Sequence, residues 1–378
     1  MSSTRIYFDN AATTQLDEKV VEAMLPFLTT NFGNPSSIYS YGREAKSAIE
    51  AARKQVAQLL GAHPGELFFT SCGTESTNMI LRRCVKDLGV KHIITSPIEH
   101  HCVLHTAEDL VHTGAIQLHF VKLLADGSID FTDLERLLQE LKSNVLVSLM
   151  HANNEIGNLL DIYAAGTLVK KYGAYFHSDT VQTLGHFNFN LHEMPVDFIT
   201  GSAHKFHGPK GSGLVYINSN TQLKPFMAGG GQERNMRAGT ENVAGIVGFG
   251  KALALAYETF EHDKAHITAI KQYLKEELIK LNPEIRFNGN QSDASLYTVL
   301  SVAFPFTPKT EMLLYTLDMA NICASGGSAC SSGANAGSHV IRAIKKDNED
   351  QATVRFSFSK FNTKAEVDQL IQTLKDLI

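Results

Sequence analysis

Cysteine is scarce in this chain of 378 residues, and basic residues form no run along it. The five cysteines lack CxxC spacing, which argues against a disulfide framework and against a cysteine zinc cluster. A formal net charge of -5 without a basic stretch makes nucleic acid and anionic membranes unsuitable partners. In a reducing compartment the thiols stay free, so each of them serves either packing or chemistry.

Long apolar runs are also missing, because the longest, such as residues 144–150, have only the length of a strand. The N-terminal sequence MSSTRIYFDN lacks the charged and then apolar layout of a signal peptide. The sequence therefore predicts a soluble cytoplasmic protein that has no membrane partner.

Short apolar segments rich in β-branched residues alternate with segments of helical periodicity as far as about residue 217. This alternation is typical of an α/β fold with a mostly parallel sheet flanked by helices. After Asn242, two long helical stretches precede a second alternation of strand and helix. We expect a large domain over residues 16–262 and a smaller α/β domain from residues 1–15 and 263–378, connected by a helix over residues 243–262.

A polar segment, TSCGTEST at residues 70–77, follows one predicted strand directly and precedes a predicted helix. Gly73, Thr74 and the free amides of the first helical turn could hold a phosphate, because backbone donors and the positive end of the helix dipole converge there. The alternative is an ordinary helix N-cap with Glu75 in the first turn.

Lys205 follows an apolar strand and is surrounded by His204, His207 and glycines. A lysine held in this way can be partly desolvated, which favours the neutral amine and allows it to condense with a carbonyl. The nearby run GPKGSG lacks the GxxxxGK[ST] spacing, so we do not expect a nucleoside triphosphate site. A solvated loop lysine is the alternative.

Asp179 stands at the end of another predicted strand, in YFHSDTVQ. A carboxylate there could bind the protonated ring nitrogen of a heteroaromatic cofactor, or it could cap the next segment. His101 and His105, four residues apart with Cys102 between them, raise a zinc site as an alternative function. The HExxH order is missing, however, and a histidine that stacks on a planar ligand or transfers a proton fits better. We expect no metal.

A phosphate cradle, a ring-nitrogen carboxylate and a carbonyl-reactive lysine, in that order on an α/β sheet, are together what pyridoxal phosphate requires. The sequence resembles the class V aminotransferase-like family and, within it, the cysteine desulfurases of the NifS/IscS type. The resemblance implies the fold type I of pyridoxal-phosphate-dependent transferases. It runs essentially end to end and rests on YFDNAAT (7–13), GNPSS (33–37), NNEIG (153–157), SAHK (202–205), GGGQER (229–234), RAGT (237–240), SAC (328–330) and VRFS (354–357).

The resemblance implies a role for each matching residue. Lys205 would bind the cofactor covalently and later move the substrate α-proton, while His100 would stack on the ring and assist proton transfer. Asp179 would pair with the ring nitrogen and Gln182 with the ring oxygen. The remaining cofactor contacts implied are Gly73, Thr74, Asn154, Ser202, His204 and Thr240, of which Thr240 would reach the neighbouring subunit of a homodimer.

The implied substrate is L-cysteine, with Arg355 as the anchor of its carboxylate and with Asn154 and Asn34 as further substrate contacts. Cys330 lies in ASGGSACSSG (324–333), whose small residues offer neither a core nor a helix. Its thiolate would attack the substrate sulfur, leaving alanine and an enzyme persulfide for a sulfur acceptor protein such as an iron–sulfur scaffold.

Three other functions stay open on the sequence. A selenocysteine lyase, or another lyase or aminotransferase of the same class, would share every cofactor residue and differ in substrate. A non-catalytic sulfur carrier would keep the fold without the chemistry, although the presence of Lys205, Asp179 and Cys330 argues against it. A zinc hydrolase would use the histidine cluster. The glycines and serines around Cys330 also predict a loop that swings between the substrate and an acceptor.

Overall fold

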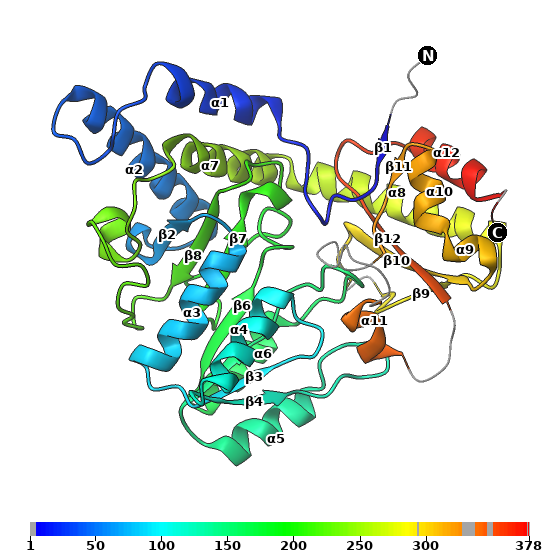
Figure 1. Cartoon of the computed structure of the whole chain (residues 1–378), viewed down its shortest axis with the longest axis horizontal. Coiled ribbons are helices and arrows are strands. Elements are labelled where there is room, and N and C mark those ends of the chain that lie inside the picture. The colour runs from blue at the N-terminus through cyan, green and yellow to red at the C-terminus, as the bar shows by residue number, and fades with distance from the viewer. Residues whose placement is uncertain (1–4, 293–294, 327–336, 346–350, 376, 378) are drawn as a thin grey trace.

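A central sheet of seven strands organises the larger part of the protein in the computed structural model (Figure 1). The structure describes residues 5–292, 295–326, 337–345, 351–375 and 377. The strands are β2 (Leu67–Thr70), β3 (His92–Thr95), β4 (Gln117–Phe120), β5 (Val145–Ser148), β6 (Tyr175–Asp179), β7 (Phe198–Ser202) and β8 (Gly213–Ile217), in the order β2-β8-β7-β6-β5-β3-β4. Strands β3 to β7 run parallel to one another, and β8 runs antiparallel to both β2 and β7.

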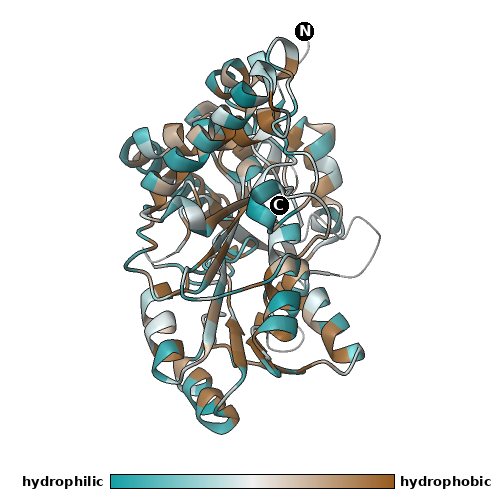
Figure 2. Cartoon of the chain, turned by 90° about the vertical axis from the view of Figure 1, so that its left-hand side faces the viewer, coloured by the Kyte–Doolittle hydropathy of each residue, from teal (hydrophilic) through white to brown (hydrophobic). Residues whose placement is uncertain are grey.

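Helices cover both faces of this sheet, so its central strands are buried almost throughout, even where β6 carries the polar residues His177 and Ser178. Successive strand residues point to opposite faces: Phe68 joins the core beneath one set of helices, whereas Leu67 and Phe69 join the core beneath the other. Figure 2 shows the same division, with apolar strands inside and striped helices outside. One face carries α3 (Gly73–Asp87) and α4 (His101–His112), and the other carries α1 (Glu18–Thr29), α2 (Ser40–Leu60), α5 (Phe131–Leu141), α6 (Ile162–Lys171) and α7 (Val243–Glu258).

A second, smaller group of elements has its own core, formed mainly by residues beyond position 266. Its antiparallel sheet has the order β12-β10-β9, and a parallel pair joins the N-terminal β1 to β11 (Figure 1). The division into two domains with the bounds given above stays a prediction. The elements are β1 (Ile6–Tyr7), α8 (Phe260–Leu281), β9 (Arg286–Phe287), β10 (Val299–Pro305), α9 (Pro308–Glu311), α10 (Leu313–Met319), β11 (Ile322–Cys323), α11 (His339–Ile344), β12 (Gln351–Ser357) and α12 (Lys364–Lys375), and short 3-10 turns occupy η1 (Pro64–Glu66), η2 (Ala203–Lys205) and η3 (Gln232–Asn235).

The connecting helix expected over residues 243–262 is shorter, because α7 ends at Glu258 and α8 begins at Phe260. The Thr259 hydroxyl donates a hydrogen bond to Asp263 Oδ2 over 2.6 Å, which stabilises the first turn of α8 after a bend of 74°. In the part of the chain that the structure describes, no single helix is long and apolar enough to cross a membrane, and only the bent pair of α7 and α8 meets that test together.

The topology brings several strand ends to one edge of the large sheet. Because β8 is antiparallel to both of its neighbours, β2 has the same direction as β7 and the other parallel strands. The carboxyl ends of β2, β3, β5, β6 and β7 therefore meet at a common edge, which is where open α/β sheets bind their ligands.

Candidate active site

A cavity of about 240 Å³ opens at this edge, between the large sheet and β12 of the smaller one. Its wall combines the N-terminal segment with residues that follow β2, β3, β5, β6 and β7. Of the residues singled out in the sequence, the structure brings together Gly73, Thr74, His100, Asn154, Asp179, Gln182, Ser202, His204, Lys205 and Arg355.

Lys205 lies in the 3-10 turn η2 that follows β7, where it is partly buried. Its Nζ donates hydrogen bonds to the main-chain oxygens of Ala11 and Ala12, over 2.6 and 2.9 Å. The side chain is thus held against the cavity wall by the N-terminal segment. This placement differs from that of a solvated loop lysine and leaves the amine facing a ligand-sized space.

Asp179 ends β6 and is buried. Its Oδ1 accepts a hydrogen bond from the amide of Val181 over 2.9 Å, so the carboxylate does cap the next segment. Its Oδ2 has a weaker partner, the thiol of Cys102 at 3.9 Å. Burial raises the pKa of Asp179, and Lys205 and the Val181 amide oppose that rise. A cationic N–H donor beside Oδ2, such as a protonated ring nitrogen, would favour the ionised form of this carboxylate.

His100 caps the N-terminus of α4, and its Nδ1 accepts a hydrogen bond from the amide of Cys102 over 3.2 Å. Burial, followed by the charge of Lys205, lowers the pKa of His100 to about 4. The imidazole is therefore neutral at physiological pH, with its proton on Nε2, and its planar ring lines the cavity. Such a ring can stack on a planar ligand and exchange a proton through Nε2.

The start of α3 is arranged as the predicted phosphate cradle requires. Its N-cap residue, Cys72, makes no side-chain capping hydrogen bond, which leaves the amides of the first turn without a cap from that residue. The hydroxyl of Ser202 is buried and has no hydrogen-bond partner among the described residues. A Cβ atom at Gly73 would approach Val181 Cγ2 to 2.6 Å, so a larger residue would fill this corner. These groups fit the phosphate of pyridoxal phosphate.

Arg355 lies in β12, and its side chain is only 2% exposed. One amino group, Nη1, donates to the main-chain oxygen of Asn154 over 2.9 Å, and the other, Nη2, donates to Asp9 Oδ1 over 2.7 Å. Its Nε is buried without a hydrogen-bond partner in the described residues. Because the guanidinium also lines the cavity, it is suited to bind a ligand carboxylate.

Two of the predicted site residues that the structure describes, Thr240 and Asn34, are not in this cavity. Thr240 is exposed and lines a separate depression of about 160 Å³, together with Arg237 and Glu241. Asn34 is exposed in the segment between α1 and α2, where its Oδ1 accepts a hydrogen bond from the amide of Ser36. Cys330 lies outside the residues that the structure describes.

The histidines that raised the zinc alternative lie at the rim. The rings of His101 and His105 stack with their centroids 4.7 Å apart, and His339 lies 4.6 Å from His101. Within the described ranges, no group of three or more His, Cys, Asp or Glu side chains is arranged to hold a metal ion.

Sequence reasoning did not find several residues of the site. The main-chain oxygens of Ala11 and Ala12 hold Lys205. Both alanines lie in the YFDNAAT segment, which carries the family resemblance but gave no indication of this contact. Glu155 accepts a short hydrogen bond from the hydroxyl of Ser338, which joins the NNEIG segment to the start of α11. Glu99, next to His100, is fully enclosed, and burial raises its pKa to about 8.

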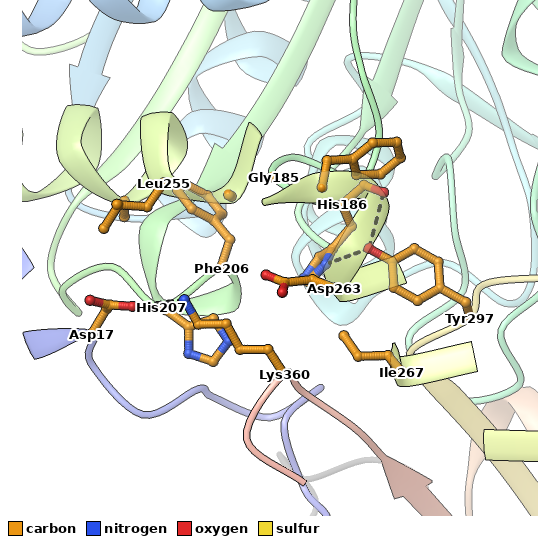
Figure 3. Close-up of a pocket in the computed structure, with 13 residues that line it drawn as sticks. Asp17, Gly185, His186, Phe206, His207, Leu255, Asp263, Ile267, Tyr297 and Lys360 are labelled. Atoms are coloured by element: carbon orange, nitrogen blue, oxygen red, sulfur yellow. Dashed lines mark hydrogen bonds and ion pairs between the residues drawn. The ribbon is translucent and has the colours of Figure 1, made fainter. Parts of the chain in front are cut away.

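A second, smaller cavity of about 30 Å³ lies behind Lys205, with His186 and Tyr297 on its wall (Figure 3). His186 donates from Nε2 to the main-chain oxygen of Lys205 over 3.0 Å, and its Nδ1 lies 3.2 Å from the hydroxyl of Tyr297. Figure 3 shows Asp263 beside this pair and Asp17 and Lys360 on the opposite side. This cavity therefore adjoins the main-chain support of Lys205 rather than its amine.

Comparison with known proteins gives a consistent result over almost the whole chain. The family model described as aminotransferase class-V matches residues 6–370. The protein named cysteine desulfurase IscS from Dictyoglomus turgidum is 41% identical over 376 residues, which cover 99% of this chain and 94% of that protein. The protein of the same name from Methanosarcina thermophila is 40% identical over 377 residues, which cover 99% and 92%.

Solved structures agree with this result. A NifS-like protein superposes with a TM-score of 0.91 at 36% identity and covers 99% of both chains. The structure titled SspA in complex with cysteine superposes with a TM-score of 0.80 at 32% identity, covering 95% of this chain and all of the other. The predicted α/β architecture is therefore confirmed.

Proposed function

The chain belongs to the aminotransferase class-V family, which depends on pyridoxal phosphate, and we propose that it is a cysteine desulfurase. In this proposal L-cysteine is converted to L-alanine and its sulfur is left on Cys330 as a persulfide. One observation carries the proposal: a single cavity gathers Lys205, the buried Asp179 and the buried Arg355. An amine, a ring-nitrogen carboxylate and a carboxylate anchor are what an amino-acid substrate of this cofactor requires.

The cofactor would be held by residues already in place. Lys205 would bind it covalently, Asp179 would pair with its ring nitrogen, and the neutral ring of His100 would stack on it. Its phosphate would lie at the N-terminus of α3, where Cys72 leaves the amides without a side-chain cap and the Ser202 hydroxyl lacks a partner in the described part of the chain. The contacts proposed in addition are those of Gly73, Thr74, Asn154, Gln182 and His204.

The protein's own groups carry the proton and sulfur steps. Arg355 holds the substrate carboxylate, which orients the α-hydrogen toward Nζ of Lys205. Once the substrate amino group has taken the place of this amine on the cofactor, the freed amine would remove the proton. When bound, the cofactor supplies an electron sink next to the substrate α-carbon. The Cys330 thiolate attacks the substrate sulfur, so that a sulfur–sulfur bond forms as the carbon–sulfur bond breaks. Protonation of the substrate β-carbon, and return of a proton to its α-carbon, then give alanine. Overall, cysteine and the enzyme thiol become alanine and the enzyme persulfide.

We propose that the protein is a homodimer, because two predicted site residues lie outside the cavity of their own chain. Thr240 is exposed and lies in a separate depression, and Asn34 is exposed as well, so both are available to a neighbouring subunit's site. The expected partners beyond L-cysteine are a sulfur acceptor protein and a second copy of the chain. A cytoplasmic location remains part of the proposal.

The test begins with purified protein loaded with pyridoxal phosphate and incubated with L-cysteine and a thiol reductant. Alanine and sulfide should appear in equal amounts, because the reductant releases the persulfide sulfur. Lys205→Ala should abolish both turnover and covalent attachment of the cofactor, which the absorbance of the protein reports after borohydride reduction and denaturation. Absence of alanine from the wild-type protein would refute the proposal, and faster turnover of selenocysteine, or of an amino donor with a keto acid, would assign the related activity instead.

A further inference from the structure

Asp9 stands where three distant segments of the chain meet beside the active-site cavity. Its side chain is 17% exposed and that of its partner, Arg355, is 2% exposed. Its Oδ1 accepts a hydrogen bond from Arg355 Nη2 over 2.7 Å, and its Oδ2 accepts one from the Ser325 hydroxyl over 2.8 Å. Each carboxylate oxygen thus has its own donor, one in β12 and the other in the segment that follows β11.

The backbone explains why these residues converge. Strand β1 pairs in parallel with β11, with Ile6 opposite Ile322 and Tyr7 opposite Cys323. Two residues further along the same register, Asp9 comes opposite Ser325. Ser325 and Arg355 exchange main-chain hydrogen bonds of 3.3 and 2.7 Å, and Asp9 forms a bridge with Ser357. Main-chain pairing therefore fixes the backbone of Asp9, and the contacts to Ser325 and Arg355 orient its carboxylate.

The arrangement gives Asp9 two simultaneous effects. An arginine side chain is long and flexible, so a fixed carboxylate on Nη2 and the fixed Asn154 oxygen on Nη1 leave its guanidinium one orientation. The same carboxylate holds Ser325, which precedes Cys330 by five positions in the sequence. Asp9 does not itself line the cavity, so it acts on a ligand only through these neighbours.

We infer that Asp9 is a positioning residue, which orients Arg355 toward the substrate carboxylate and ties Ser325, at the start of the segment leading to Cys330, to the same point. This inference deepens the proposed function and rests on it, because Arg355 is the carboxylate anchor only in that proposal. It assigns to the N-terminal segment a part in substrate recognition in addition to its contact with Lys205.

The test measures binding rather than turnover, because binding isolates the carboxylate contact. Wild-type holoenzyme is titrated with L-alanine and with L-alaninamide, which lacks the carboxylate, and the cofactor absorbance is followed. The wild type should bind alanine more tightly than alaninamide. Asp9→Ala should weaken alanine binding about tenfold or more and leave alaninamide binding unchanged, because only the carboxylate contact depends on Arg355.

A conservative variant separates positioning from charge. Asp9→Asn keeps an oxygen for Arg355 and an amide for the Ser325 hydroxyl, so it should recover most of the alanine binding lost in Asp9→Ala. The matched control is Asp17→Ala, because Asp17 also joins the N-terminal segment to a C-terminal cation, Lys360, over 2.7 Å, and its side chain is similarly buried. This control should bind alanine within about twofold of the wild type.

Equal alanine binding by Asp9→Ala and the wild type would overturn the inference. If Asp9→Ala does not fold, Ser325→Ala decides the matter, since it removes only the contact to Oδ2. That variant should weaken alanine binding severalfold, and unchanged binding would overturn the inference. Failure of the proposed function would appear differently, as wild-type protein that forms no alanine from L-cysteine.

Discussion

His186 donates a hydrogen bond from Nε2 to the main-chain oxygen of Lys205, over 3.0 Å. The acceptor is a carbonyl, so the proton must lie on Nε2, and Nδ1 is then an acceptor. The hydroxyl of Tyr297 lies 3.2 Å from Nδ1 and 3.3 Å from the main-chain oxygen of His186, and it can donate to either. Burial lowers the pKa of His186, which keeps this tautomer neutral. The backbone of the proposed cofactor lysine is thus held from behind by a residue outside the active-site cavity.

Replacing His186 by Phe should therefore lower activity without removing any group that lines the cavity. The Lys205 oxygen would lose its donor, and a buried acceptor without a partner costs about 1–3 kcal/mol. We expect kcat/KM for L-cysteine to fall about tenfold and the melting temperature to drop, as measured by steady-state assays and thermal unfolding. Tyr297→Phe should have a smaller effect in the same direction. His262→Gln, at an exposed histidine, is the control, and wild-type kinetics and stability in His186→Phe would contradict the predicted support.

Cys330→Ala should separate cofactor binding from sulfur transfer. The visible absorbance of the bound cofactor should persist, because its proposed contacts come from other residues. Alanine formation from L-cysteine should fall by about a hundredfold or more, since no thiolate remains to take the sulfur. Chromatographic assay of alanine checks this, with Cys323→Ala as the control because Cys323 pairs in β11 and does not line the cavity. Undiminished alanine release would mean that another cysteine is the nucleophile.

Stability should decrease as the pH falls from about 6.5 towards 4. Burial lowers the pKa of His177 to about 3, and the pKa values of His151 and His207 to about 4. Between these values and the unfolded pKa of about 6.5, only the unfolded chain binds the protons, so each histidine costs roughly 1.4 kcal/mol per pH unit. Above 6.5 their contribution is constant. Glu99, whose pKa burial raises to about 8, has the opposite slope but is a single group.

Urea unfolding at pH 7.5, 6 and 5 checks this dependence, with the midpoint expected to fall at each step. His177→Asn should flatten the curve between pH 6 and 5, because it removes the histidine with the lowest pKa. A midpoint that stays constant or rises over this interval would contradict the assignment of neutral buried histidines.

Glu233→Gln should destabilise the fold, since Glu233 and Arg53 form a buried ion pair. Arg53 Nη1 and Nη2 contact the two carboxylate oxygens at 2.8 Å, and the amide of Phe69 also donates to Glu233. Removing the Glu233 charge leaves the buried Arg53 with only the more exposed Glu50 as an ionic partner, and we expect the free energy of unfolding to fall by about 3 kcal/mol. Glu50→Gln is the matched control, because Glu50 also contacts Arg53 but its side chain is 36% exposed, and its loss should cost less than about 1 kcal/mol. Equal effects of the two substitutions would contradict this account, as measured by chemical denaturation.

Much of the fold and the site was predictable from local patterns. The strands and the polar residues that follow them were visible because burial on both faces of a parallel sheet requires continuous apolar runs. Parallel strands share the edge at which they end, so the grouping of Gly73, Asp179 and Lys205 followed from topology. The helix break at Thr259 was not predictable, because apolar periodicity continues across it.

The sequence by itself determined the fold class, the family resemblance and the identity of most side chains in the cavity, because these depend on local periodicity and on residue types at strand ends. Only the tertiary structure decided which distant residues hold these side chains in position. Asp9 and Arg355 are separated by 346 positions, and Lys205 is held by Ala11, 194 positions earlier. Such contacts depend on the register between distant strands, and no local pattern encodes that register.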